Sequence, residues 1–149
     1  MMRLGGARHE RGAAAVEFGL ILPVLLMIIG GIIDFGIMYN KQILLSNAAR
    51  DGVRQVVVNQ TTGGWSASDI QSRVSQAANP LALSSTFTLE RSTDNGTSWT
   101  TASVWYCQVS GDLMRLTVRP QTPFDYTILK FVPGLPKPAI KGTATMTCG

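Results

Sequence analysis

Histidine is almost absent from this chain, and its scarcity limits the chemistry that the chain can perform. The one histidine, His9, lies in a short basic segment at the N-terminus. The rest of the chain has no Ser-His or Cys-His pair for nucleophilic catalysis and no histidine ligand for a metal. The sequence also lacks the phosphate loop G-x4-G-K-S/T. We therefore expect no catalytic residue, no metal, no cofactor and no enzyme activity.

Charged residues are few and dispersed. The chain has 13 Lys and Arg against 9 Asp and Glu, which gives a net charge of +4 at pH 7. Beyond Arg11 the cationic residues occur singly, so the sequence has no basic patch of the kind that binds nucleic acid. The acidic residues are spread over separate segments with no shared motif. Neither a nucleic acid nor a small-molecule substrate is expected as a partner.

Cysteine occurs only twice, at Cys107 and Cys148. This spacing fits no metal-ligand template, and a single disulfide is the interpretation that we favour. Both cysteines lie in segments of alternating polarity, which predicts that they share the apolar faces of neighbouring strands. Such a disulfide would close a loop of about 40 residues and stabilise the fold by about 4 kcal/mol. Two buried free thiols are the alternative.

A long apolar run dominates the N-terminal part of the chain. From Phe18 to Ile33 the sequence carries no charged residue, and Ala13 to Val16 extend the run on the other side of Glu17. About 20 helical residues cross the roughly 30 Å hydrocarbon core of a bilayer, so the run predicts a transmembrane helix over residues 13–39. A cleaved secretory signal is the alternative, but its apolar region is shorter and ends at small residues, whereas this run ends in DFGIMYNK.

The basic residues predict the orientation of this helix. Arg3, Arg8 and Arg11 precede the apolar run, and Lys41 follows it. Positive charge favours the cytoplasmic side of a membrane, so we expect the N-terminus in the cytoplasm and the rest of the chain in the periplasm. Disulfides persist in that compartment, which agrees with the expected pairing of the cysteines.

Two carboxylates accompany the apolar run. A charged side chain deep in lipid costs about 2.5–3.5 kcal/mol on insertion scales. Asp34, at the end of the run, is expected to lie at the headgroup boundary, where that cost is small. Gly30 and Gly31 are either ordinary residues of a membrane helix or the place where another helix approaches closely. For Glu17, near the other end of the run, the neighbouring residues suggest a specific role.

The order of residues near the N-terminus resembles the type IV prepilin signal. It consists of a basic leader, Gly12, four apolar residues, Glu17 and Phe18. The resemblance implies that a membrane-embedded prepilin peptidase cleaves between Gly12 and Ala13, which makes Glu17 the fifth residue of the mature chain. Cleavage would create a cationic α-amino group on Ala13 in a layer of low dielectric constant, where Glu17 could pair with it in the same or a neighbouring subunit. Such a buried pair would set the register between helices rather than add large net stability.

The TadE-like minor pseudopilins of bacterial tight-adherence (Tad, or Flp) pilus systems resemble this chain in more than the cleavage signal. The resemblance covers RGAAAVEFGLILPVLLMIIGGIIDFG followed by SNAARDGVRQ, and returns in RPQTPFDYTILKFVPGLPKPAIKGTATMTC. It implies a single-pass inner-membrane protein that packs through its N-terminal helix, with Glu17 and Phe18 at the contact, to support pilus biogenesis and adhesion. The implied partners are the prepilin peptidase and other pilins or pseudopilins of the same system.

Two alternatives stay open. A pseudopilin of a type II secretion or type IV pilus system would carry the same cleavage signal and would be distinguished by the assembly genes beside it. A membrane-tethered periplasmic binding protein or enzyme would use the helix only as an anchor. In that second case, Glu17 would be dispensable.

The expected fold class is α+β, with the long N-terminal helix continuing into a small exported domain that contains an antiparallel sheet. We expect a basic leader at 1–12, the transmembrane helix at 13–39, a helical extension at 40–60 and the exported domain at 61–149. The extension should end at TTGG and direct one apolar face to the core, made of Ile43, Leu44, Ala48, Val53 and Val56 or Val57. Ser66 with Asp69 predicts the N-terminal cap of a short second helix, which Asn79-Pro80 stops.

Apolar and polar residues alternate after Thr86, which predicts strands. We expect them in TFTLER, near Trp99 after a turn at Asp94–Gly96, in VWYCQVS, in LMRLTVR and in the last segment through Cys148. The apolar segment Phe124–Pro138 contains three prolines that prevent central-strand pairing. We favour a place for this segment in the core under the sheet over a surface patch that meets a partner or the membrane.

Overall fold

The structure is a computed structural model that describes residues 7–58, 65–85 and 87–149, with side chains from residue 12 onward. The expected helix end at TTGG and most of the basic leader's side chains lie outside these residues. Clustering of contacts divides the chain into two compact units. Unit 1 combines the N-terminal helix up to Ile37 with Tyr126–Leu135, and unit 2 combines Met38–Asp125 with Pro136–Gly149.

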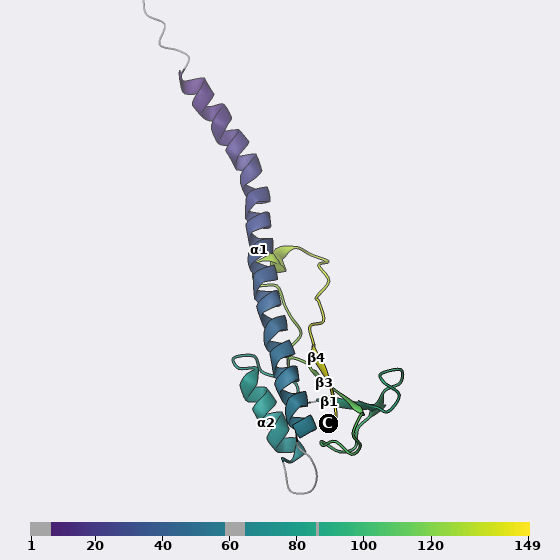
Figure 1. Ribbon diagram of the computed structural model, residues 1–149. Helices are drawn as coiled ribbons and strands as arrows, with labels where there is room; N and C mark the ends of the chain where they lie inside the picture. Colours follow the sequence, from purple (N-terminus) through teal and green to yellow (C-terminus); the bar gives the residue numbers. More distant parts are fainter. Residues whose placement is uncertain (1–6, 59–64, 86) are drawn as a thin grey trace, which may run out of the picture. The chain divides into compact units, whose positions relative to one another are not determined.

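Helix α1 runs from Ala7 to Val58 as one continuous element of 52 residues (Figure 1). It passes through Pro23, and it joins the expected membrane segment to the expected extension. The later elements are short: α2 (Ala67–Ala77), β1 (Thr88–Ser92), β2 (Thr100–Thr101), β3 (Leu113–Val118), the 3₁₀ turn η1 (Leu129–Phe131) and β4 (Gly142–Thr147).

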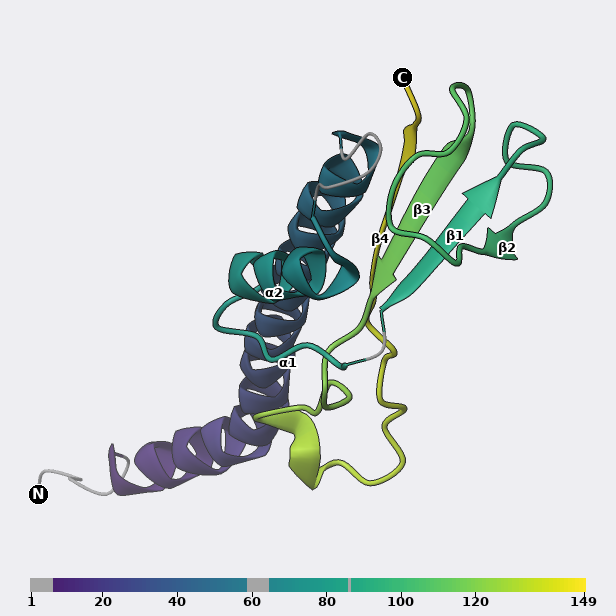
Figure 2. The same ribbon diagram turned by 90° about the horizontal axis from the view of Figure 1, so that it is seen from below.

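The four strands form one antiparallel sheet in the order β2-β1-β3-β4 (Figure 2). In β3 the buried residues alternate with partly exposed ones, as expected of a strand with one face on the core. A long apolar helix followed by a small domain with an antiparallel sheet confirms the expected α+β class.

The core of unit 2 lies between the C-terminal part of α1, helix α2 and one face of the sheet. Its fully buried members are Leu45, Ala48, Ala49, Val53, Val56, Ile70, Val74, Ala78, Leu116 and Val118. The α1 residues among them recur every three to four positions, so they form one face of the helix. The prediction was right for Ala48, Val53 and Val56 but wrong for Ile43, which is 43% exposed because Leu45 occupies the core face of that turn.

Two glycines allow close approach within unit 2. A Cβ atom on Gly142, the first residue of β4, would overlap the backbone carbonyl of Leu45 in α1. A Cβ atom on Gly52 would overlap the side chains of Val74 and Leu116. The strand and both helices therefore pack at distances that only a residue without a side chain permits.

Helix α2 begins with the predicted cap. The Ser66 hydroxyl accepts the backbone N–H of Asp69 at 3.2 Å, and the Asp69 carboxylate accepts the backbone N–H of Ser66 at 3.0 Å. This reciprocal arrangement is a capping box, and its hydrogen bonds, chiefly those from Ser66, lower the pKa of Asp69. The helix buries Ile70 and Val74 and ends at Ala77, just before Asn79 and Pro80.

The expected strand in VWYCQVS is wrong. Residues 102–112 contain no strand, and Val109 is 53% exposed. Both edges of β3 are occupied by β1 and β4, so this segment has no neighbouring edge there with which to pair. A disulfide nevertheless joins Cys107 to Cys148, with their Cα atoms 5.7 Å apart. It ties a loop to the residue that follows β4, rather than linking two adjacent strands.

Candidate assembly and membrane-anchoring helix

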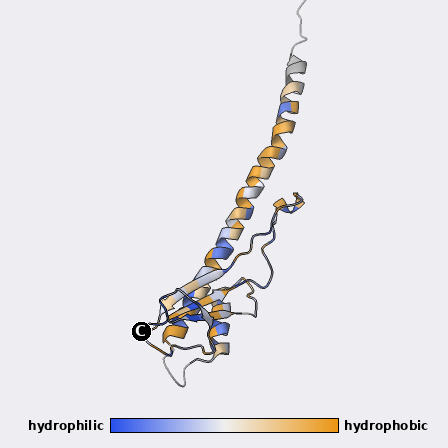
Figure 3. Ribbon diagram, turned by 90° about the vertical axis from the view of Figure 1, so that its right-hand side faces the viewer, coloured by the Kyte–Doolittle hydropathy of each residue, from blue (hydrophilic) through white to orange (hydrophobic). Residues whose placement is uncertain are grey.

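The apolar part of α1 is bare on most of its surface. Every large apolar side chain from Val16 to Ile33 is exposed, from 36% for Leu22 to 73% for Leu20. The most apolar window of this helix has a mean hydropathy of 2.5, and the helix is long enough to cross a membrane (Figure 3). Apolar surface of this extent is unfavourable in water and calls for lipid or another apolar surface to cover it. The helix is therefore compatible with a single-pass membrane protein.

Glu17 and the expected cleavage position lie on this exposed helix. A Cβ atom on Gly12 would meet no atom within 4 Å. Glu17 is exposed, and it makes no hydrogen bond or ion pair within the described part of the chain. It follows Ala13 by four residues, or about 6 Å along the helix axis. The carboxylate is thus available for a partner that this single chain does not supply.

Asp34 lies in contact with a distant segment of the chain. Its side chain is fully buried by contacts within the chain, and its expected place at the headgroup boundary stays a prediction. The carboxylate accepts three successive backbone N–H groups, from Thr127 at 2.9 Å, from Ile128 at 3.0 Å and from Leu129 at 2.7 Å. Asp34 therefore holds the start of the η1 turn against α1. No local pattern in the sequence indicates this contact, since its partners are backbone groups far along the chain.

Gly30 lies one helical turn before Asp34 and faces the same segment. A Cβ atom there would come within 2.7 Å of Ile128 Cγ2, and one on Gly31 would lie 3.9 Å from Leu129 Cδ1. The close approach that Gly30 permits is therefore made by this chain's own segment after Tyr126. The glycine and the aspartate together form the seat on α1 for that segment.

The segment Phe124–Pro138 is divided between the two units. Phe124 is 1% exposed in unit 2, where the Lys41 ammonium lies 5.3 Å from its ring centroid. Tyr126–Leu135 instead packs on α1 in unit 1, and Phe131 is 79% exposed. The expected place in the core under the sheet is therefore correct for Phe124 and wrong for Tyr126–Leu135, because the Asp34 carboxylate and Gly30 seat that part on the helix.

The N-terminal part of the chain also carries a family signature. Residues 12–54 match the family model described as TadE-like protein. Over these residues the chain is similar to the TadE-like family. The match begins at Gly12 and includes both Glu17 and Asp34. No curated protein and no solved structure matches the chain.

The expected resemblance to the TadE-like family is confirmed over the matched residues, which fall within α1. The TadE-like stretch includes the whole exposed apolar surface from Val16 to Ile33 and ends in the part of α1 that packs in unit 2. Exposed apolar residues and core-forming residues thus both lie within the matched segment.

Several charged residues of unit 2 are engaged in structural contacts. Arg91 pairs with Asp112, which is only 6% exposed, and Arg115 pairs with Glu90 at 2.8 Å. Asp94 accepts the Ser92 hydroxyl at 2.6 Å and the Ser98 backbone N–H at 2.9 Å, and these hydrogen bonds lower the pKa of Asp94. Within the described residues, no three His, Cys, Asp or Glu side chains gather as a metal site would require.

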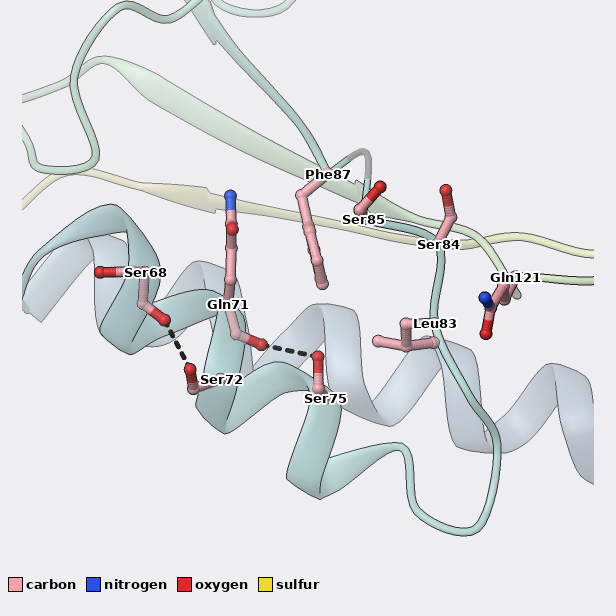
Figure 4. A pocket seen from close by; sticks show the side chains of 9 residues that line it. All are labelled: Ser68, Gln71, Ser72, Ser75, Leu83, Ser84, Ser85, Phe87 and Gln121. Carbon is pink, nitrogen blue, oxygen red and sulfur yellow. Dashed lines mark hydrogen bonds between the residues drawn. The ribbon is translucent and has the colours of Figure 1, made fainter.

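An open pocket of about 660 Å³ lies between α2 and the segment before β1 (Figure 4). Serine and glutamine side chains line most of it, together with Leu83 and Phe87. Two of its hydroxyls are already used within α2, where Ser72 donates to the Ser68 carbonyl and Ser75 to the Gln71 carbonyl, each at 2.8 Å. The pocket adds no charged group to the contacts described above.

Proposed function

We propose that this chain is a minor pseudopilin of a Tad pilus system. In this proposal α1 anchors it once in the inner membrane, with the N-terminus in the cytoplasm and unit 2 in the periplasm. Prepilin peptidase cleaves it between Gly12 and Ala13, and the mature helix then packs beside other pilins or pseudopilins through Glu17 and Phe18. The protein supports pilus biogenesis and adhesion without catalysing a reaction.

One observation carries the proposal: a TadE-like helix exposes an unbroken apolar surface that contains a single, unpaired carboxylate. Glu17 is the only charged residue between Gly12 and Ile33, and it has no partner among the described residues. Intramembrane carboxylates are costly and are usually paired. A chain that used α1 only as a tether would gain nothing from one at this position.

Cleavage after Gly12 would supply the missing partner. It would place a cationic α-amino group on Ala13 at the new start of the helix, about one helical turn from Glu17. The positive end of the helix dipole also favours a carboxylate in this first turn. In a neighbouring copy or a related pilin, the same amine would lie at the same membrane depth, so an intermolecular pair would fix the stagger between adjacent helices.

The test replaces Glu17 by glutamine in the bacterium that makes this protein and measures surface pili and adherence. Glu17→Gln keeps the size of the side chain and removes its charge. Asp51→Asn is the matched control, because Asp51 is an exposed carboxylate of the same helix in unit 2. We expect Glu17→Gln to abolish or strongly reduce piliation at an unchanged level of membrane-bound protein, and Asp51→Asn to leave it intact. Normal piliation with Glu17→Gln would support the tether alternative instead.

A further inference from the structure

Unit 1 contains a feature that pilin packing does not use, namely the segment Tyr126–Leu135 seated on α1. We infer that this segment, hereafter the membrane loop, inserts into the periplasmic leaflet of the bilayer and that Asp34 latches it there. The inference rests on the proposed membrane anchor, because it places the loop at the depth of the helix residues that hold it.

The depth of the loop follows from its contacts. Asp34 accepts the loop's backbone N–H groups, and the Ile128 side chain reaches Gly30, four residues nearer the N-terminus. Four helical residues span about 6 Å, so the loop extends along α1 toward the middle of the apolar run. The flanking helix residues Ile29, Ile32 and Ile33 are all exposed, so the same apolar surface surrounds the seat. A membrane that covers these side chains also meets the loop.

Irregular backbone is tolerated at such a depth only where its polar groups are satisfied. The Asp34 carboxylate accepts the N–H groups of Thr127, Ile128 and Leu129, and the Leu129 carbonyl accepts the N–H of Val132 at 3.0 Å. These bonds satisfy successive donors at the start of the η1 turn, and they in turn stabilise a carboxylate that would be unfavourable in lipid by itself. The aspartate and the loop are therefore compatible with the membrane together and not separately.

The exposed side chains of the loop suit the membrane interface. Phe131 is 79% exposed, and the Lys130 ammonium lies 5.5 Å from the centroid of its ring. An aromatic ring beside a long cationic chain is typical of interfacial anchors, in which the ring enters the apolar layer and the ammonium reaches the headgroups. Half-buried Leu129 and Val132 continue the apolar surface on either side. Phospholipid is thus the partner that this chemistry fits.

The experiment measures the depth of single labelled positions in the full-length chain. The chain is reconstituted in vesicles of phosphatidylcholine and phosphatidylglycerol, with the phosphatidylcholine acyl chains brominated or not. A cysteine that carries an environment-sensitive fluorophore replaces Phe131 in the loop, Ile32 on the exposed face of α1, or Thr122 on the surface of unit 2. Labelling without reductant leaves the disulfide between Cys107 and Cys148 unreactive, which the chain without an added cysteine verifies.

We expect brominated lipid to quench the label at positions 131 and 32, with blue-shifted emission, and to leave the label at position 122 unquenched. Quenching at 32 but not at 131 would overturn the membrane loop and leave the anchor standing. Absence of quenching at 32 would instead overturn the anchor on which both proposals rest. Quenching at 131 that disappears as the protein-to-lipid ratio rises would assign the loop to a second copy of this chain and would also overturn the inference.

Replacement of Asp34 tests the latch separately. Asp34→Ala should abolish most of the quenching at position 131 and leave quenching at position 32 unchanged, whereas Asp34→Asn, which keeps one acceptor oxygen, should give an intermediate loss. Non-reducing electrophoresis verifies that unit 2 keeps its disulfide in both variants. Full quenching at 131 in the Asp34→Ala chain would contradict the latch.

Discussion

Gly142 lies so close to the backbone carbonyl of Leu45 that no side chain fits between strand β4 and helix α1. Both residues belong to unit 2, where Leu45 is fully buried. The contact joins the first residue of the last strand to the C-terminal part of α1. It places the start of β4 against the core of unit 2.

Replacement of Gly142 should therefore destabilise unit 2. In Gly142→Ala the new methyl group would meet backbone atoms, which cannot move aside as a flexible side chain can, and overpacking of this kind costs about 1–3 kcal/mol or more. We expect a lower unfolding midpoint for the full chain in detergent, as measured by circular dichroism. Gly36→Ala is the control, because a Cβ atom there would meet nothing within 4 Å. Equal midpoints for the two variants would refute the close contact.

The disulfide between Cys107 and Cys148 closes a loop with a sequence separation of 41. In the chain-entropy model, a loop of this length contributes about 4 kcal/mol by restricting the unfolded chain. The double variant Cys107→Ser/Cys148→Ser should accordingly unfold at a lower denaturant concentration than the oxidised protein. Reductant should lower the stability of the parent chain and leave the double variant unchanged. An effect of reductant on both would show that the loss is unrelated to this disulfide.

Asp94 makes the stability of unit 2 depend on acid pH. Hydrogen bonds from Ser92 and Ser98 lower its pKa in the folded protein below the unfolded value of about 3.9. The folded state thus holds the proton less tightly, so the contribution is complete above the unfolded pKa and is lost as the pH falls through the folded pKa. We expect the unfolding midpoint to decrease below about pH 4 and to decrease less steeply in Asp94→Asn. Parallel profiles for the two proteins would exclude Asp94 as the source.

Local chemistry explains which elements were predictable. The predicted cap of α2 was correct because Ser66 and Asp69 are three residues apart. Each side chain accepts the backbone N–H of the other residue, and no other part of the fold is needed. The alternation in β3 was equally reliable, since Met114, Leu116 and Val118 are buried on one face. The resemblance to the TadE-like family was recognisable because Gly12, Glu17 and the apolar run are contiguous in the sequence.

The errors arose where distant segments decide the outcome. VWYCQVS alternates as a strand does, but both edges of β3 are taken by β1 and β4, so Cys107 lies in a loop. Asp34 ends an apolar run, and nothing in that position indicates that its side chain is buried. Its partners are the backbone N–H groups of residues 127–129. Almost every residue type has such a group, so the amino-acid sequence does not indicate this contact.

The mass of the N-terminal peptide of the native protein tests the central claim most directly. The account holds that proteolysis after Gly12 gives Glu17 its cationic partner, so protein isolated from cells that contain the cognate prepilin peptidase should begin at Ala13. Cells without the peptidase should accumulate the longer chain and lack pili. A native protein that begins upstream of Ala13 in normally piliated cells would contradict the account.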